Sequence, residues 1–391
     1  MNTRLYTWVI TTILMIFMSV GLSSCKHHDE PDPAPKTVSR TILVYMVANN
    51  NLGSRGYDTQ DLNEMLTAAR SGGLHNGRLL VYHAPYCQTP ALKEITPEGI
   101  VTRLEYGTDL PSVSAARMSQ VIDDAKALAP AGDYGIVLWS HATGWLQTGI
   151  EETIQPKTTD GIRPLDYGDD NGQTMRITTL AKVLDGKNFS FVYCDCCHMA
   201  SVEVAYELRY ATDYIVGSVT ELPAAGMRYD LNIPVLLRDG DPDLIQAAKN
   251  TYEHYSSLSL MENRTCTMSV IATAALDELA AATRDIYASG ADLSTAYEPQ
   301  PFEISDNCHY FDLANYVLSY DTDHALKERW NAAIDRTVMY KANTPYIWAL
   351  LQIRTHCGLS TYPLTDPSKA SESGYSELQW YNDVASYIDP N

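Results

Sequence analysis

Tyr134-Gly-Ile-Val-Leu-Trp139 is an apolar run that ends in Ser140-His141, and Phe189-Ser-Phe-Val-Tyr193 is a second run that ends in Cys194-Asp-Cys-Cys-His198. Short apolar runs without alternation are typical of strands buried on both faces of a parallel sheet. In an open parallel sheet, ligands bind outside the carboxyl ends of the strands. We therefore expect the two polar segments to share one crevice.

Predicted strands and helices alternate on both sides of these runs. Apolar runs at 41–48 and 78–84 predict buried strands, and helical spacing covers 58–70 and 112–128. Such alternation requires crossover connections, so it predicts an α/β fold with a mainly parallel sheet and helices on both faces. Beyond residue 231 the pattern becomes more helical, with helices predicted over 241–255, 274–287, 311–318, 325–340 and 375–388.

The cysteine-rich segment 194–197 precedes a helix that we predict over 199–210. A thiol at such a strand-to-helix turn lies near the positive end of the helix dipole, which lowers its pKa and favours the thiolate. His141 could then act as general base and acid toward that thiolate. The alternative for a single histidine at a strand end is a purely structural role.

Composition excludes several classes of function. The chain has 391 residues, with 28 Lys and Arg against 48 Asp and Glu and a formal charge of −20. Nucleic-acid binding depends on clustered basic residues, so this balance argues against it. The sequence contains no glycine-rich phosphate loop, which leaves a nucleotide enzyme without support. With 45% hydrophobic and 19% charged residues, the chain is instead typical of a packed globular protein.

The first 38 residues predict export and anchoring. Residues 1–24 combine a basic start with a short apolar run, and Leu22-Ser-Ser-Cys25 resembles a bacterial lipobox, which predicts lipid attachment at Cys25. The acidic, proline-rich stretch 25–38 is typical of a stiff tether. We expect a protein anchored by lipid outside the cytoplasm, at the outer membrane or cell surface of a Gram-negative bacterium. The alternative is a plain secretory signal with an incidental cysteine.

Removing Cys25 from the eight cysteines leaves seven, which is an odd number. At least one thiol must then stay unpaired in a compartment that permits disulfides, which suggests a reactive thiol. The alternative is that all seven are small buried hydrophobic residues. Three of them crowd into 194–197, and this is where we expect the chemistry.

Together these motifs resemble the clostripain family of cysteine peptidases, which are relatives of caspases, legumains and gingipains. The resemblance is carried by Ser140-His-x-x-Gly-Trp145, by Asp195-x-Cys-x-Met199 and by Glu203-Val-Ala-Tyr-Glu-Leu208. It implies a caspase-like three-layer sandwich over 39–260, with a mixed α/β C-terminal region over 261–391 packed on it.

The resemblance also implies the roles of individual residues. His141 matches the catalytic histidine and Cys197 the nucleophile, while backbone N–H groups of Ala142 and Cys197 would form the oxyanion hole. Asp195 matches the acidic group that selects Arg or Lys before the scissile bond, which agrees with charge-assisted pairing. Ser218 and Glu221 match positions that complete the substrate pocket. Protein or peptide substrates are expected, with no cofactor and no metal.

The family commonly cleaves itself between its histidine and its cysteine. Here that interval contains the aperiodic segment 146–175, whose only basic residues are Lys157 and Arg163. Long polar loops are favoured sites of proteolysis. We expect cleavage into two associated chains, with Lys157 favoured because a proline follows Arg163.

Two other functions remain open on the sequence. The cluster of cysteines with His198 and His141 could form a zinc site, although neighbouring residues on a strand end point in opposite directions. A binding lipoprotein that has lost turnover is the second alternative, because Ala142 replaces the usual glycine and could strain or crowd the oxyanion hole.

Overall fold

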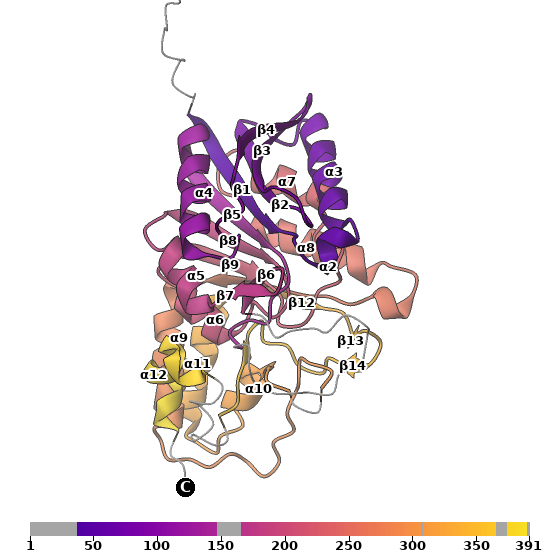
Figure 1. The fold of residues 1–391 in the computed structure, drawn as a ribbon. Coiled ribbons are helices and arrows are strands. Elements are labelled where there is room, and N and C mark those ends of the chain that lie inside the picture. The colour runs from indigo at the N-terminus through magenta and orange to yellow at the C-terminus, as the bar shows by residue number, and fades with distance from the viewer. Residues whose placement is uncertain (1–36, 147–165, 306–307, 365–373, 389–391) are drawn as a thin grey trace, which may run out of the picture. The chain divides into compact units, whose positions relative to one another are not determined.

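A computed structural model describes residues 37–146, 166–305, 308–364 and 374–388, and their centre is a sheet of nine strands (Figure 1). The strand order is β12-β10-β9-β8-β5-β1-β2-β3-β4. Five strands in the middle run parallel, namely β1 (Val38–Val47), β2 (Gly77–Ala84), β5 (Ala131–Trp139), β8 (Phe189–Asp195) and β9 (Thr212–Gly217). The edges are antiparallel and consist of β3 (Ala91–Thr96), β4 (Gly99–Glu105), β10 (Thr267–Ala272) and β12 (Val338–Asn343).

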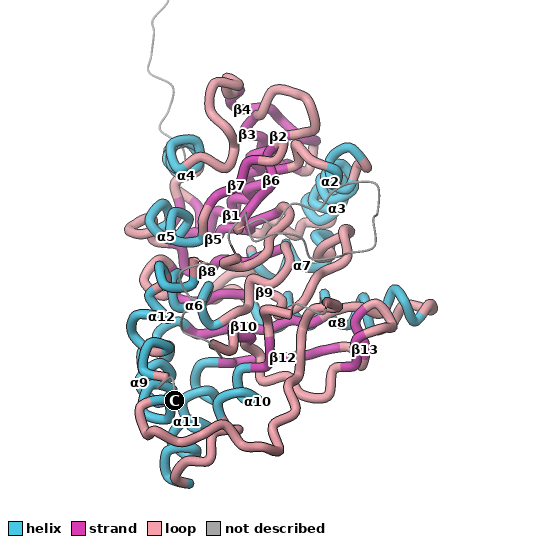
Figure 2. The backbone as a smooth tube through the Cα atoms, turned by 60° about the horizontal axis from the view of Figure 1, so that its bottom comes forward, coloured by secondary structure: helices cyan, strands magenta, loops and turns pink. Residues whose placement is uncertain are grey.

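Helices cover both faces of the sheet, which completes the predicted three-layer sandwich (Figures 1 and 2). One face packs against α3 (Tyr57–Arg70), α7 (Tyr229–Leu236) and α8 (Leu244–Ser256). The other face packs against α4 (Ala115–Leu128), α5 (Ile177–Leu184), α6 (Val202–Leu208), α9 (Leu276–Tyr287), α11 (His324–Thr337) and α12 (Gln379–Asp383). The strands are buried on both faces because each face has its own apolar core, and this explains their uninterrupted apolar runs.

The C-terminal region contributes to the same sheet. Strands β10 and β12 lie beyond residue 260, yet β10 pairs with β9, and β12 pairs with β10. Residues 36–391 form one compact unit by their contacts. Smaller elements of this region are β11 (Phe311–Asp312), α10 (Leu313–Val317), β13 (Tyr346–Ile347), β14 (Leu351–Gln352) and β15 (Ser360–Thr361). The division that we expected at residue 260 therefore does not coincide with an edge of the sheet.

Several predicted elements differ in detail. Strand β3 was not predicted, because the charged residues Lys93 and Glu94 interrupt its apolar pattern. In the structure Lys93 contacts the His83 imidazole, and Glu94 pairs with two arginines. The helix predicted over 311–318 is divided between β11 and α10, and Asp312 caps α10. The closing helix predicted over 375–388 is a short α12 between two 3-10 turns. Local propensity cannot reveal such interruptions, since tertiary contacts decide them.

The aperiodic segment 146–175 contains structure at its end, a hairpin of β6 (Tyr167–Asp170) and β7 (Gln173–Met175). Residues 147–165, with Lys157 and Arg163, lie outside the described residues, as do residues 1–36 with the predicted signal, Cys25 and most of the tether. Within the described ranges, no helix is both long enough and apolar enough to cross a membrane.

The packing between β5 and β8 gives a test of the fold. Gly135 pairs in register with Phe191, and a Cβ at Gly135 would overlap the buried Phe191 ring. Overpacking of this kind costs about 1–3 kcal/mol. Gly135→Ala should therefore lower the urea midpoint of unfolding clearly. Gly132→Ala, on the same strand, is the control, because its Cβ would meet only the Ser39 carbonyl oxygen at 3.5 Å. Equal midpoints for the two variants would contradict this packing.

Candidate active site

His141 lies two residues beyond the end of β5 and is oriented by a side chain from α2 (Asn51–Ser54), the short helix that follows β1. The Nε2 atom of His141 lies 2.5 Å from Oδ1 of Asn51. Because an amide oxygen only accepts hydrogen bonds, Nε2 carries the hydrogen and Nδ1 is the basic nitrogen. Burial and the nearby Arg55 guanidinium lower the pKa of His141, which keeps the imidazole neutral and able to accept a proton.

The backbone around His141 is fixed by the segment that leads into β6. Gly168 N–H donates to the His141 carbonyl at 2.9 Å, and Thr143 N–H donates to the Asp166 carbonyl at 3.2 Å. The Ser140 hydroxyl donates to the Val47 carbonyl at 2.9 Å. The ends of β1 and β5 and the start of the β6–β7 hairpin are thereby joined.

Cys197 lies two residues beyond the end of β8, which is the strand paired with β5. Its side chain is partly exposed. Its Sγ accepts a hydrogen bond from Leu222 N–H at 3.4 Å and donates to the Leu222 carbonyl at 3.9 Å. No hydrogen bond between His141 and Cys197 occurs among the described residues, so each group is held by a different neighbour.

The thiol does not have the lowered pKa that the sequence predicted. Burial and the Glu221 carboxylate raise the pKa of Cys197 to about 12. The expected helix dipole is remote, because α6 begins only at Val202, after the Ser201 cap, and residues 198–201 form turns and a bridge. The prediction of a helix from residue 199 was wrong, since the Ser201 hydroxyl accepts from Val204 N–H and fixes the later start.

The neighbouring cysteines have a different environment. Cys194 and Cys196 are buried in the apolar core, and all seven cysteines of the described residues are free thiols. In the described part of the chain, no group of three or more His, Cys, Asp or Glu side chains is arranged to hold a metal. Of the cysteines in 194–197, Cys197 alone is accessible to a substrate.

Asp195 lies at the base of this region and is buried. It accepts hydrogen bonds from Met227 N–H at 2.9 Å and from the Tyr229 hydroxyl at 3.0 Å. The loop approaches it closely at Gly226, where φ is 58° and a Cβ would lie 2.6 Å from Oδ2. Burial raises the pKa of Asp195 to about 7.

A second buried carboxylate, Asp61 on α3, lies close to Asp195. Its Oδ2 accepts from the Trp139 indole N–H at 2.6 Å, whereas its Oδ1 is buried and has no hydrogen-bond partner among the described residues. Burial and the charge of Asp195 raise the pKa of Asp61 to about 9. Two carboxylates, one with an unsatisfied oxygen, favour a cationic group between or beside them.

Sequence reasoning missed both Asp61 and Asn51. A signal for Asp61 exists, because Asp58, Asp61 and Glu64 recur every three residues and share one face of α3 with apolar Leu62 and Met65. Carboxylates on the face of a helix that packs against a sheet are buried, so they need hydrogen-bond or charge partners or have a function. Asn51 has no such pattern, since only the fold brings it to His141.

The remaining predicted site residues take different positions. The Ser218 hydroxyl is fully buried and lies 2.7 Å from the Thr267 hydroxyl. It belongs to a buried hydrogen-bond network with threonines and does not reach the protein surface. Glu221 is partly exposed, and its Oε2 accepts from the Trp348 indole at 2.8 Å. Ala142 is buried and is not among the described residues with positive φ, so alanine strains no backbone there.

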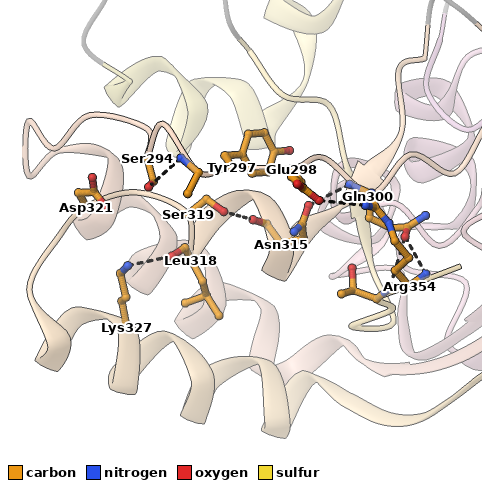
Figure 3. Close-up of a pocket in the computed structure, with 12 residues that line it drawn as sticks. Ser294, Tyr297, Glu298, Gln300, Asn315, Leu318, Ser319, Asp321, Lys327 and Arg354 are labelled. Carbon is orange, nitrogen blue, oxygen red and sulfur yellow. Dashed lines mark hydrogen bonds and ion pairs between the residues drawn. The ribbon is translucent and has the colours of Figure 1, made fainter.

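A polar cavity of about 480 Å³ lies apart from this site, in the C-terminal region (Figure 3). The polar groups along its wall bond to one another: Lys327 donates to the Leu318 carbonyl at 2.8 Å, and Ser319 to the Asn315 carbonyl at 2.6 Å. The cavity shares no residue with the His141 and Cys197 region. It therefore contributes nothing to the chemistry assigned here.

Comparison with known proteins agrees with this geometry. The sequence profile of the clostripain family matches residues 44–352. An inactive zymogen C11 protease from Parabacteroides distasonis is 29% identical, with a TM-score of 0.75 over 90% of this chain and 99% of that one. A secreted C11 cysteine protease from Bacteroides thetaiotaomicron, iotapain, is 25% identical, with a TM-score of 0.76 over 89% of this chain and 99% of that one.

A secreted C11 cysteine protease from the same organism in complex with an irreversible peptide inhibitor is 28% identical, with a TM-score of 0.72 over 88% of this chain and 99% of that one. No curated protein gives a significant match. The profile covers most of the chain, and the solved proteases share its caspase-like fold over most of their length. The chain therefore belongs to the clostripain family of cysteine proteases.

Proposed function

We propose that this cysteine protease cleaves peptide bonds with Cys197 as nucleophile and His141 as general base and acid. The observation that carries the proposal is the placement of a partly exposed thiol, and of a histidine whose Nδ1 is the basic nitrogen, beyond the ends of paired strands β8 and β5. The thiolate attacks the carbonyl carbon, and the imidazolium then gives its proton to the leaving amine. Asn51 holds the imidazole in the required tautomer.

The backbone N–H groups of Ala142 and Cys197 stabilise the oxyanion in this proposal. The absence of positive φ at Ala142 supports it, because alanine can take the place of glycine without strain. The alternative of a binding protein without activity rested on strain at Ala142, so this observation weakens it.

We further propose that substrates carry Arg or Lys before the scissile bond. The support is the pair of buried carboxylates, Asp195 and Asp61, of which Asp61 has an unsatisfied oxygen. A guanidinium or ammonium group would donate to that oxygen and offset one unit of the negative charge of the pair. An apolar side chain would leave them unpaired, which costs roughly a few kcal/mol.

The uncleaved chain is proposed to be a precursor. In support, the Cys197 thiol is bonded to Leu222, has a pKa raised to about 12, and makes no hydrogen bond to His141 among the described residues. One structural relative is an inactive zymogen. We propose activation by cleavage at Lys157 or Arg163, in a protein tethered by lipid on Cys25 at the outer membrane or cell surface.

Hydrolysis tests the nucleophile. Cys197→Ala should abolish cleavage of fluorogenic peptides, because the attacking sulfur is removed. Cys196→Ala is the matched control and should retain most activity, since the Cys196 thiol is buried in the apolar core. Activity that survives in Cys197→Ala but disappears in Cys196→Ala would assign the nucleophile to the neighbouring residue.

Substrate selectivity and its pH dependence test the acidic pocket. A bound cation favours ionised carboxylates, so the ratio of kcat/KM for Arg over Ala substrates should rise as pH increases through about 7, where Asp195 loses its proton. Asp195→Asn should remove this rise and lower cleavage after Arg by roughly tens- to hundreds-fold. The ratio cancels the titration of the catalytic pair. Equal cleavage after Arg and Ala by the wild type would refute the pocket.

Gel electrophoresis tests activation. Purified wild type should give two fragments under denaturing conditions and Cys197→Ala a single band, because the enzyme cleaves its own loop. Lys157→Ala should slow the appearance of fragments more than Arg163→Ala, since a proline follows Arg163. An intact and fully active wild type would show that activity needs no cleavage.

A further inference from the structure

A tryptophan from the C-terminal region contacts the loop that holds the Cys197 thiol. Trp348 lies between β13 and β14, and its indole N–H donates to Oε2 of Glu221 at 2.8 Å. Its backbone N–H donates to the Thr265 hydroxyl, also at 2.8 Å. The tryptophan is thus fixed at its backbone and at its ring, and it bridges segments far apart in the sequence.

The backbone at this turn is strained. Trp348 and Ala349 have φ values of 51° and 58°, a left-handed conformation that residues other than glycine rarely adopt. Such conformations cost of order 1–3 kcal/mol each and persist where surrounding contacts enforce them, often at functional sites. Here the β13–β14 hairpin closes around the turn, and Trp348 is held by its contacts with Thr265 and Glu221.

A continuous chain of contacts runs from this turn to the nucleophile. Glu221 precedes Leu222, whose N–H donates to Cys197 Sγ at 3.4 Å and whose carbonyl accepts from the thiol at 3.9 Å. We infer that Trp348 is a positioning residue for the nucleophile: by holding the Glu221 carboxylate, it fixes both the loop that contacts the Cys197 thiol and the direction of the negative charge beside it.

The charge of Glu221 acts on both catalytic groups. With Asp195, it disfavours the thiolate of Cys197, and with Asp169, it favours the imidazolium of His141, which Arg55 opposes. The indole donor keeps the carboxylate turned toward β13 and β14. Without that donor, the carboxylate turns toward the catalytic pair, where it repels the thiolate and attracts the protonated imidazole.

The inference rests on the proposed role of Cys197, and alkylation measures the thiol without requiring turnover. Iodoacetamide should alkylate Cys197, identified by mass spectrometry, with a pH profile that reports its ionisation. Trp348→Phe keeps the ring and removes the donor. We expect it to move the profile to higher pH and to slow alkylation at pH 7 by roughly three- to tenfold, with a parallel loss in kcat and little change in KM.

A double-mutant cycle separates this role from a structural one. Glu221→Gln removes the charge and should move the alkylation profile to lower pH. In that background, Trp348→Phe should have no further effect, because no carboxylate remains to be held. An equal slowing in both backgrounds would overturn the inference and assign Trp348 a structural role, as would an unchanged profile in Trp348→Phe.

Leu350→Ala is the matched control, because Leu350 belongs to the same turn and is 73% exposed. It should leave the alkylation profile and the hydrolysis rate unchanged. A shift equal to that of Trp348→Phe would show that any change in the turn acts on the thiol, and would overturn the specific role of the indole. If Cys197→Ala retained hydrolysis, the proposed nucleophile would fail, while the cycle would still measure the contact.

Discussion

The parallel pairing of β5 with β8 is the constraint on which the site depends. Trp139 and Asp195 are partners in that register, so His141 and Cys197 leave the sheet at the same edge. Gly135 leaves room for the Phe191 ring, which occupies the space that a Cβ on this residue would fill. Burial of both strands under helices on each face fixes the register, since a slip by one residue would exchange the two faces.

Two buried carboxylates on one face of this sheet are the basis of the proposed pocket for a basic side chain. Asp195, from β8, and Asp61, from α3, approach each other beneath the loop at Gly226. Asp61 keeps one oxygen without a partner, which the fold tolerates by raising its pKa to about 9. A protonated, partly satisfied pair is stable without substrate and becomes strongly attractive to a basic side chain as the protons leave.

The catalytic groups are each held by a neighbour from elsewhere in the chain. Asn51 orients His141, and Leu222 bonds the Cys197 thiol. Trp348 reaches the same loop from the C-terminal region, which also completes the sheet through β10 and β12. The C-terminal region thus contributes both to the sheet and to the surroundings of the proposed catalytic groups. In the inference drawn above, its contact with Glu221 links the β13–β14 hairpin to the ionisation of the thiol.

The sequence by itself determined the alternation of strands and helices, because apolar runs and helical spacing follow directly from burial on two faces. It also placed His141 and Cys197 at strand ends, and the family match and the nine-stranded sheet confirm the fold that those motifs predicted. It failed where tertiary contacts override local signals. Lys93 and Glu94 look exposed in sequence, yet each has a partner on a strand that neighbours β3.

Only the tertiary structure decided the pKa of the Cys197 thiol. The sequence predicted a lowered pKa from a helix dipole, whereas a late helix start, burial and the Glu221 carboxylate raise it. Asn51 and Trp348 lie far along the chain from the groups they contact, and no local pattern encodes such proximity. The spacing of acidic residues on α3 marks Asp61 as unusual, but it does not reveal that Asp195 lies close to it. The physical reason is that a residue type and its spacing specify the period of an element, while charge, burial and hydrogen bonding depend on what folding brings beside it.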